Sequence, residues 1–322
     1  MLILIHCIFL KVLKLVKKTK YWLLASIAFT YALIFIGGFV RVSDSGLGCP
    51  DWPKCFDRWY PPLHSSEIPG NFTDYYDNYN CTNSEECDDF DITKAWIEYL
   101  NRLFGAITGL VMLVAVFYLY KVKTDYQAAF YLGASALLLT GVEGLIGKYV
   151  VTSHLDGSII TVHLLIALVI ISLLIMSYKQ ITWNKKSDCS VYSLDQTYII
   201  KWIFILMISG IVLGTQVRAD IENLIPLSAI GPFKYVHSFL GIGTLMLTGV
   251  LWNKTNNEES IIKTKGLVKM LLNIFIVQVI LGYFMVFGGL PAYAKLIHMW
   301  FASIGLGIIT YILMDIRLSS SA

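Results

Sequence analysis

The chain has 322 residues, of which 56% are hydrophobic and 15% are charged, and its mean hydropathy is +0.65. This composition excludes an ordinary soluble globular protein and indicates a polytopic membrane protein. The formal net charge of +3 gives no reason to expect nucleic acid as a partner. The apolar composition makes the lipid bilayer the expected surrounding.

Eight apolar runs are each about as long as a helix needs to cross the hydrocarbon core, roughly 20 residues. Because the runs are continuous and do not alternate with polar residues, they predict helices and not a β-barrel. The runs cover residues 21–41, 97–120, 127–148, 159–178, 197–217, 233–252, 267–288 and 294–314. We therefore expect an all-α membrane protein with eight transmembrane helices.

Lysine and arginine are concentrated before the first run, in alternate connections and at the end of the chain. By the positive-inside rule, both termini are expected in the cytoplasm. The connection 42–95 would then lie outside, and it carries eleven Asp or Glu residues. The opening decapeptide MLILIHCIFL is too short to span a bilayer. It is expected to belong to a cytoplasmic or interfacial lead-in, residues 1–20.

Four of the six cysteines lie in the outer loop, where an oxidising compartment favours disulfides. Four cysteines can be paired in three ways, and we expect the pairing in which each cysteine bonds to its nearer neighbour in the sequence. A zinc site is the alternative, but the loop has no CxxC spacing and no nearby pair of histidines. The expected disulfides are Cys49–Cys55 and Cys81–Cys87.

The chain repeats a unit of four spans. The segment EYLNRLFG, residues 98–105, aligns with KYVHSFLG, residues 234–241, and sets Asn101 opposite His237. Two separations agree as well, since 163 − 143 = 20 and 298 − 278 = 20. The further matched pairs are Arg41 with Arg218, Glu143 with Gln278, and His163 with His298.

Four is an even number of spans, so both halves are expected to point the same way through the membrane, as two tandem parallel four-helix bundles. The N-terminal half is expected at residues 21–180 and the C-terminal half at residues 197–316. A cytoplasmic linker, residues 181–196, would join them, and residues 317–322 would form a tail.

His237 and His298 are both expected about one turn below the outer ends of their spans. A histidine inside a bilayer is costly and usually functional, although an interhelical hydrogen bond is the simpler alternative. Two histidines underfill a zinc site, whereas they complete the coordination of a haem iron as its axial ligands. Facing helices of a four-helix bundle can hold such a cofactor in the bundle core.

Arg41 and Arg218 end the first and fifth spans at the level of these histidines. The planar guanidinium suits pairing with carboxylates, so both arginines are candidates for contact with haem propionates. Alternatively, they mark the membrane boundary and reach into the headgroups without a partner.

The N-terminal half has His163 but carries Asn101 where the other half has a histidine. An iron there would have one strong ligand and a weakly guarded opposite side. Glu98 lies on the same helix face as Asn101, one turn nearer the outer surface, which suggests chemistry and not electron storage. An ion pair of Glu98 with Arg102, four residues on, is the alternative, and both can hold at once.

Glu143 is a further acidic residue expected within a span, where such residues are rare. Its repeat counterpart is the neutral Gln278. That match favours a structural polar position over a catalytic role.

With these segments identified, the sequence resembles the haem A synthase family over essentially its whole length. The resemblance rests on SDSGLGCPDWP, IEYLNRLFG, HLLIA, YVHSFLG and LIHMWFA, in this order on eight spans. It implies a membrane enzyme that oxidises the C8 methyl group of haem O, by successive hydroxylations, to the formyl group of haem A.

The resemblance also implies haem B as an electron-transfer cofactor between His237 and His298. Haem O, the substrate, would bind in the N-terminal half. Many members of the family have histidine at the position of Asn101. We therefore expect His163 alone to hold the substrate iron, with Asn101 on the opposite side.

The family's essential glutamate carries over to Glu98, and its outer cysteine pair carries over to Cys49 and Cys55. Expected partners are a haem O synthase, the terminal oxidase assembly and an electron acceptor that the sequence does not name. The expected location is a bacterial plasma membrane, with the haem sites near the outer face.

Two other functions remain open at this point. A membrane cytochrome b that only carries electrons would explain the histidine pair but not the loss of a histidine in one half. A haem carrier for oxidase assembly would suit binding by one ligand. A solute transporter is disfavoured, because parallel repeats with outer histidines offer no ion site at the membrane midplane.

Overall fold

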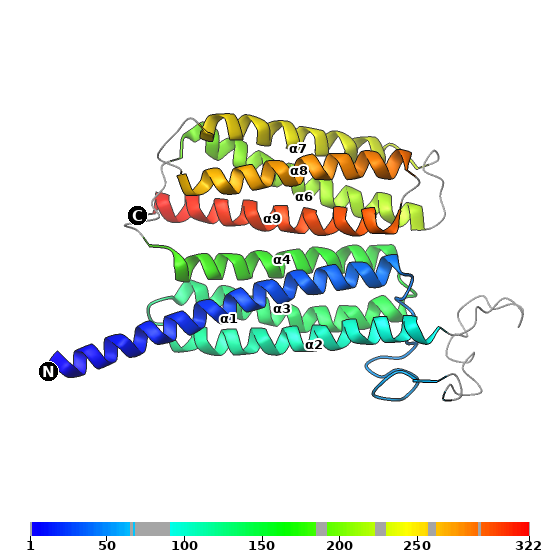
Figure 1. Ribbon diagram of the computed structural model, residues 1–322, viewed down its shortest axis with the longest axis horizontal. Helices are drawn as coiled ribbons and strands as arrows, with labels where there is room; N and C mark the ends of the chain where they lie inside the picture. Colours follow the sequence, from blue (N-terminus) through cyan, green and yellow to red (C-terminus); the bar gives the residue numbers. More distant parts are fainter. Residues whose placement is uncertain are drawn as a thin grey trace, which may run out of the picture.

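The computed structural model describes residues 2–64, 67, 91–184, 192–222, 230–256, 262–288 and 291–321. These segments contain eight long helices and no strand (Figure 1): α1 (Leu2–Val42), α2 (Ile92–Lys121), α3 (Gln127–Thr152), α4 (Gly157–Thr182), α6 (Leu194–Glu222), α7 (Phe233–Asn256), α8 (Ile262–Phe287) and α9 (Ala292–Ser320). Each helix contains a stretch long and apolar enough to cross a membrane. The predicted all-α fold with eight spanning helices is confirmed.

The helices extend beyond the apolar runs. The lead-in and the first span form one continuous helix, α1, instead of two separate segments. Helix α2 begins at Ile92 because the Asp91 carboxylate accepts hydrogen bonds from the backbone N–H groups of Thr93 (2.8 Å) and Lys94 (3.3 Å). These bonds, first that from Thr93, lower the pKa of Asp91. Asp156 caps α4 in the same way.

Figure 1 shows the helices as two groups, α1–α4 and α6–α9, with the N and C termini at the same end of the array. Within each group, each helix packs against its neighbours in sequence, and the first also packs against the last. Across the boundary between the groups, α9 contacts α1 and α4, and α6 contacts α4. We call this boundary the seam.

Each group has its own apolar core. Since lipid tails are as apolar as leucine, such cores hold membrane helices together through close packing more than through the hydrophobic effect. The N-terminal core includes the fully buried side chains Leu23, Met112, Leu119 and Leu174. The C-terminal core includes Ile203, Leu251, Leu271 and Ile309.

Polar contacts cross the seam. The indole Nε1 of Trp300 donates to the backbone carbonyl of Tyr31 at 3.0 Å, and its rings pack edge-on against Phe35. Lys179 Nζ lies 2.6 Å from Asp315 Oδ1, and these side chains are only 5% and 8% exposed. Because breaking a buried ion pair leaves an uncompensated charge, this pair resists separation of α4 from α9.

Candidate functional site

Helices α7 and α9 bring His237 and His298 together, with their ring centroids 6.1 Å apart. Two opposed metal–nitrogen bonds of about 2 Å, plus the half-width of each ring, require a separation of roughly 6 Å. Nδ1 of His237 lies 2.9 Å from the carbonyl oxygen of Gly210. A carbonyl only accepts, so Nδ1 carries the hydrogen and Nε2 keeps the lone pair that a metal needs.

A glycine lies against the ligand position in each half. A Cβ atom on Gly214 of α6 would lie 2.9 Å from Cε1 of His237, closer than packed atoms allow. In the N-terminal half, a Cβ on Gly37 of α1 would lie 3.9 Å from Oδ1 of Asn101. The two glycines are 214 − 37 = 177 residues apart, and 218 − 41 = 177 separates the repeat arginines. The repeat therefore extends to the packing around Asn101 and His237.

The N-terminal site differs from its counterpart in its polar atoms. Oδ1 of Asn101 is buried and has no hydrogen-bond partner in the described part of the chain. On α4, Nδ1 of His163 contacts Oε2 of Glu143 on α3. The sequence did not predict this contact. The short α3–α4 connection was the available signal, since an antiparallel hairpin brings residues at similar distances from its loop to similar depth.

The counterpart of Glu143 makes a different contact. Nε2 of Gln278 on α8 donates to the backbone carbonyl of His298 at 2.8 Å. Its Oε1 atom and Nδ1 of His298 are both buried, and neither has a hydrogen-bond partner among the described residues. The pairs Glu143–His163 and Gln278–His298 occupy matched positions but have different charge.

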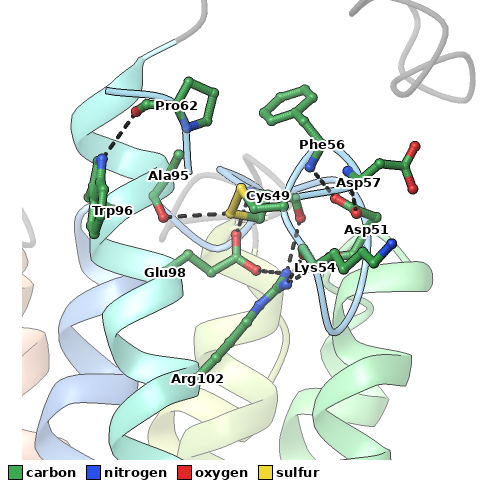
Figure 2. The surroundings of a disulfide bond; sticks show 11 residues. Cys49, Asp51, Lys54, Phe56, Asp57, Pro62, Ala95, Trp96, Glu98 and Arg102 are labelled. Atoms are coloured by element: carbon green, nitrogen blue, oxygen red, sulfur yellow. Dashed lines mark hydrogen bonds and ion pairs between the residues drawn. A yellow bond between two sulfur atoms is a disulfide. The ribbon is translucent and has the colours of Figure 1, made fainter. Parts of the chain in front are cut away.

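Glu98 and Arg102 connect α2 to the outer loop, as Figure 2 shows. Glu98 is 3% exposed; its Oε1 accepts from Arg102, and its Oε2 accepts from the backbone N–H of Cys49 at 2.9 Å. The guanidinium also donates to three loop carbonyls, those of Asp51 at 2.7 Å, Lys54 at 2.9 Å and Cys49 at 3.1 Å. The ion-pair interpretation of Glu98 is therefore observed, and the pair has a further function of holding the loop.

The loop packs directly on the first turn of α2. A Cβ on Gly48 would lie 2.6 Å from the backbone of Lys94 and Ala95, so only glycine fits there. A disulfide joins Cys49 to Cys55, the first of the two expected local pairs, and both cysteines are fully buried (Figure 2). The second expected pair, Cys81–Cys87, lies outside the described residues.

The two arginines end their helices as expected. Arg41 lies in the last turn of α1. Arg218 lies near the end of α6, and its Nη1 approaches Sδ of Met299, the neighbour of His298, at 3.9 Å. The guanidinium of Arg218 thus lies against the side chain of Met299 on α9.

A site made of protein ligands alone is not supported. In the parts of the chain that the structure describes, no three His, Cys, Asp or Glu side chains are grouped so that they could hold a metal ion. The paired imidazoles, with the glycine backbone beside them, instead fit a group that brings its own equatorial ligands. Haem is such a group.

Comparisons with known proteins identify the family. Residues 20–226, more than half of the chain, match the family described as cytochrome oxidase assembly protein, COX15-CtaA. Haem A synthase of Shewanella oneidensis is 29% identical over 70% of this chain and 69% of its own length. Haem A synthase of the Wolbachia endosymbiont of Brugia malayi is 27% identical over 90% of this chain and 94% of its own. Haem A synthase COX15 of Saccharomyces cerevisiae is 30% identical over 45% of this chain and 30% of its own.

The matched range 20–226 covers the first half with its outer loop and the whole of α6. The Wolbachia relative, similar over 90% of this chain, extends the similarity through the second half. These relatives and the eight membrane helices lead to the same assignment. The chain is an integral membrane protein that belongs to the cytochrome oxidase assembly protein family, the family of the haem A synthases.

Proposed function

We propose that the chain is a haem A synthase, which oxidises the C8 methyl group of haem O to a formyl group by successive hydroxylations. The similarity to a haem A synthase over 90% of the chain carries this proposal. The unequal ligand sets of the two halves support it, because an enzyme of this type needs one haem as a cofactor and another as a substrate.

In the C-terminal half, residues 197–316, haem B would bind between His237 and His298. A haem with two strong axial ligands supplies reversible one-electron transfer. The hydrogen bond from His237 to Gly210 fixes the tautomer needed for ligation. Arg218 is the propionate candidate here, since a guanidinium suits pairing with a carboxylate.

In the N-terminal half, residues 21–180, His163 would hold the iron of haem O. Asn101 on the opposite side is a weak ligand, so that side stays open for chemistry. Arg41 is the propionate candidate here. The half with two histidines would store and pass electrons, while the half with asparagine would carry out the oxidation.

Glu98 is the proposed catalytic residue at the outer end of this site. Its contacts with Arg102 and with the backbone of Cys49 support a carboxylate that is held in one orientation. Preorganised charge of this kind is effective because it needs no rearrangement during the reaction. Glu98→Gln keeps the shape but removes the charge, so haem should still bind while product formation falls.

The expected setting is a bacterial plasma membrane with both haem sites toward the outer face and both termini in the cytoplasm. A haem O synthase would supply the substrate, and the assembling terminal oxidase would receive the product. The electron acceptor is a separate partner.

The first test is expression with a supply of haem O, followed by purification and identification of the extracted haems by chromatography and mass. Haem B together with haem A, or with the alcohol intermediate, supports the synthase. Haem B alone, with no haem A in the membranes, would overturn the proposal in favour of an electron carrier.

A second test concerns Asn101. The Asn101→His variant should give a second low-spin haem signal and slower turnover, because both axial positions become strongly ligated. Asn101→Gln is the matched control, since it offers no imidazole and should leave the spectrum unchanged. Identical spectra for wild type and Asn101→His would contradict the interpretation that His163 alone ligates the substrate iron.

A further inference from the structure

Glu143 is a buried carboxylate that the proposed reaction leaves without a role. It lies within α3, and its side chain is 10% exposed. Ionisable groups inside a membrane helix are costly and are kept where they act on a partner. In this structure, the partner is Nδ1 of His163.

The exposure of His163 shows which part of the ring is available. Its side chain is 42% exposed, but its Nδ1 atom is buried and in close contact with Oε2 of Glu143, an approach that lacks hydrogen-bond geometry in this structure. An ionised Glu143 would favour the tautomer with the hydrogen on Nδ1 and the free lone pair on Nε2, because a carboxylate can only accept. That tautomer would be able to bind iron through Nε2.

The C-terminal half provides the comparison. The amide of Gln278 donates to the His298 backbone and carries no charge. Nδ1 of His237 donates to the neutral carbonyl of Gly210. In the described part of the chain, His163 is the one proposed iron ligand whose ring contacts a carboxylate.

We infer that Glu143 is the positioning residue of the substrate site, where it orients His163 and strengthens it as an iron ligand. This inference rests on the proposed function, since it assumes that haem O binds in the N-terminal half. A carboxylate that accepts the Nδ1–H hydrogen adds electron density to the ring and raises the basicity of Nε2. It also favours the oxidised iron, because second-shell hydrogen bonding is one of the factors that set a haem's reduction potential.

The unequal repeat explains why this strengthening is needed here. The haem B site has two histidines, and either can hold the iron while the other adjusts. The substrate site has Asn101 in place of the second histidine, so its iron depends on His163. A stronger single ligand compensates for the missing one.

The test uses Glu143→Gln, which gives the N-terminal half the amide that the C-terminal half already has. Purified protein containing haem B is titrated with haem O, and the reduction potentials of both haems are followed optically. The dissociation constant for haem O should rise about 10- to 100-fold, the usual effect of losing such a partner of a metal-bound histidine. The potential of the substrate haem should rise, while that of haem B should not change.

Gln278→Glu is the matched control, because it makes the same exchange in reverse in the other half. It should leave the affinity and potential of the substrate haem at the wild-type values. Retention of haem B by Glu143→Gln shows that the variant is folded. If Glu143→Gln binds haem O with unchanged affinity and potential, the inference is wrong. If wild-type protein binds no haem O at all, the proposed function fails first, and the two failures are thus distinguished.

Discussion

Replacing Arg102 with methionine removes the guanidinium that ties the outer loop to α2 while keeping much of the apolar stem. The change deletes the ion pair with Glu98 and the hydrogen bonds to three loop carbonyls. Glu98, 3% exposed, would be left as a buried carboxylate that keeps backbone contacts such as the N–H of Cys49 but has lost its ion-pair partner. We expect the docked loop to open far more often.

The size of the effect follows from the burial of the pair, whose side chains are 13% exposed for Arg102 and 4% for Glu98. Removing one partner of a buried ion pair costs about 3–5 kcal/mol. When the loop is open, the Glu98 carboxylate is hydrated and does not need Arg102. The loss of Arg102 therefore raises the free energy of the closed state only. Since 1.4 kcal/mol is a factor of ten, the open population should rise by roughly a hundredfold to a few thousandfold.

The buried disulfide reports this opening. Its sulfur atoms are inaccessible while the loop is docked, so its reduction depends on the open population. Membranes are first treated to block free thiols and are then exposed to a membrane-impermeant phosphine. The thiols that appear at Cys49 and Cys55 are labelled and quantified by mass spectrometry. The reduction rate should rise by the factor given above.

Arg58→Met is the matched control, because Arg58 lies in the same loop but pairs with Glu67 at the surface, with side chains 43% and 30% exposed. Exposed pairs contribute about 0–1 kcal/mol, so this variant should change the reduction rate by less than about fivefold. Equal rates for the two variants would refute the claim that the buried pair holds the loop.

Two further predictions concern the interior. Gly214→Ala should lose haem B, because the new Cβ would lie 2.9 Å from Cε1 of His237. Gly210→Ala is the control and should keep haem B, because a Cβ at that position meets nothing within 4 Å. Equal haem content in the two variants would contradict the prediction. Lys179→Met should lower the free energy of unfolding of the detergent-solubilised protein by about 3–5 kcal/mol, because the Asp315 charge loses its ion-pair partner and keeps the hydrogen bond from Tyr192. Adding Asp315→Leu should restore most of the loss, and no restoration would show that the charge was not the cause.

The helices were predictable because length and apolar composition are local properties. All eight spans were predicted, and the errors lie at the helix ends, whose positions depend on capping residues. The cap Asp91 makes α2 begin at Ile92, five residues before the apolar run 97–120. The lead-in, residues 1–20, continues into the first span as a single helix. A run of ten residues is too short to span alone, but nothing between it and the next run breaks the helix, so α1 is continuous.

The site was only partly predictable. The repeat identified Asn101 and His237 as counterparts, because duplication preserves sequence positions. The repeat also matched Glu143 with Gln278, but it gave no sign that the acid contacts the ring of His163 while the amide binds the His298 backbone. The reach of Arg102 to three loop carbonyls depends on how residues 49–54 fold, which no helical periodicity encodes.

The ion pair across the seam also has a consequence for biosynthesis. Lys179 is on the fourth helix of the chain and Asp315 is on the last, 315 − 179 = 136 residues later. At about 5–20 residues per second, roughly 7 to 27 seconds pass before the ribosome supplies the acid. During that interval the ammonium group must be kept at the water interface or shielded by an insertion factor. Completion of the last helix would therefore end a period of dependence on the insertion machinery.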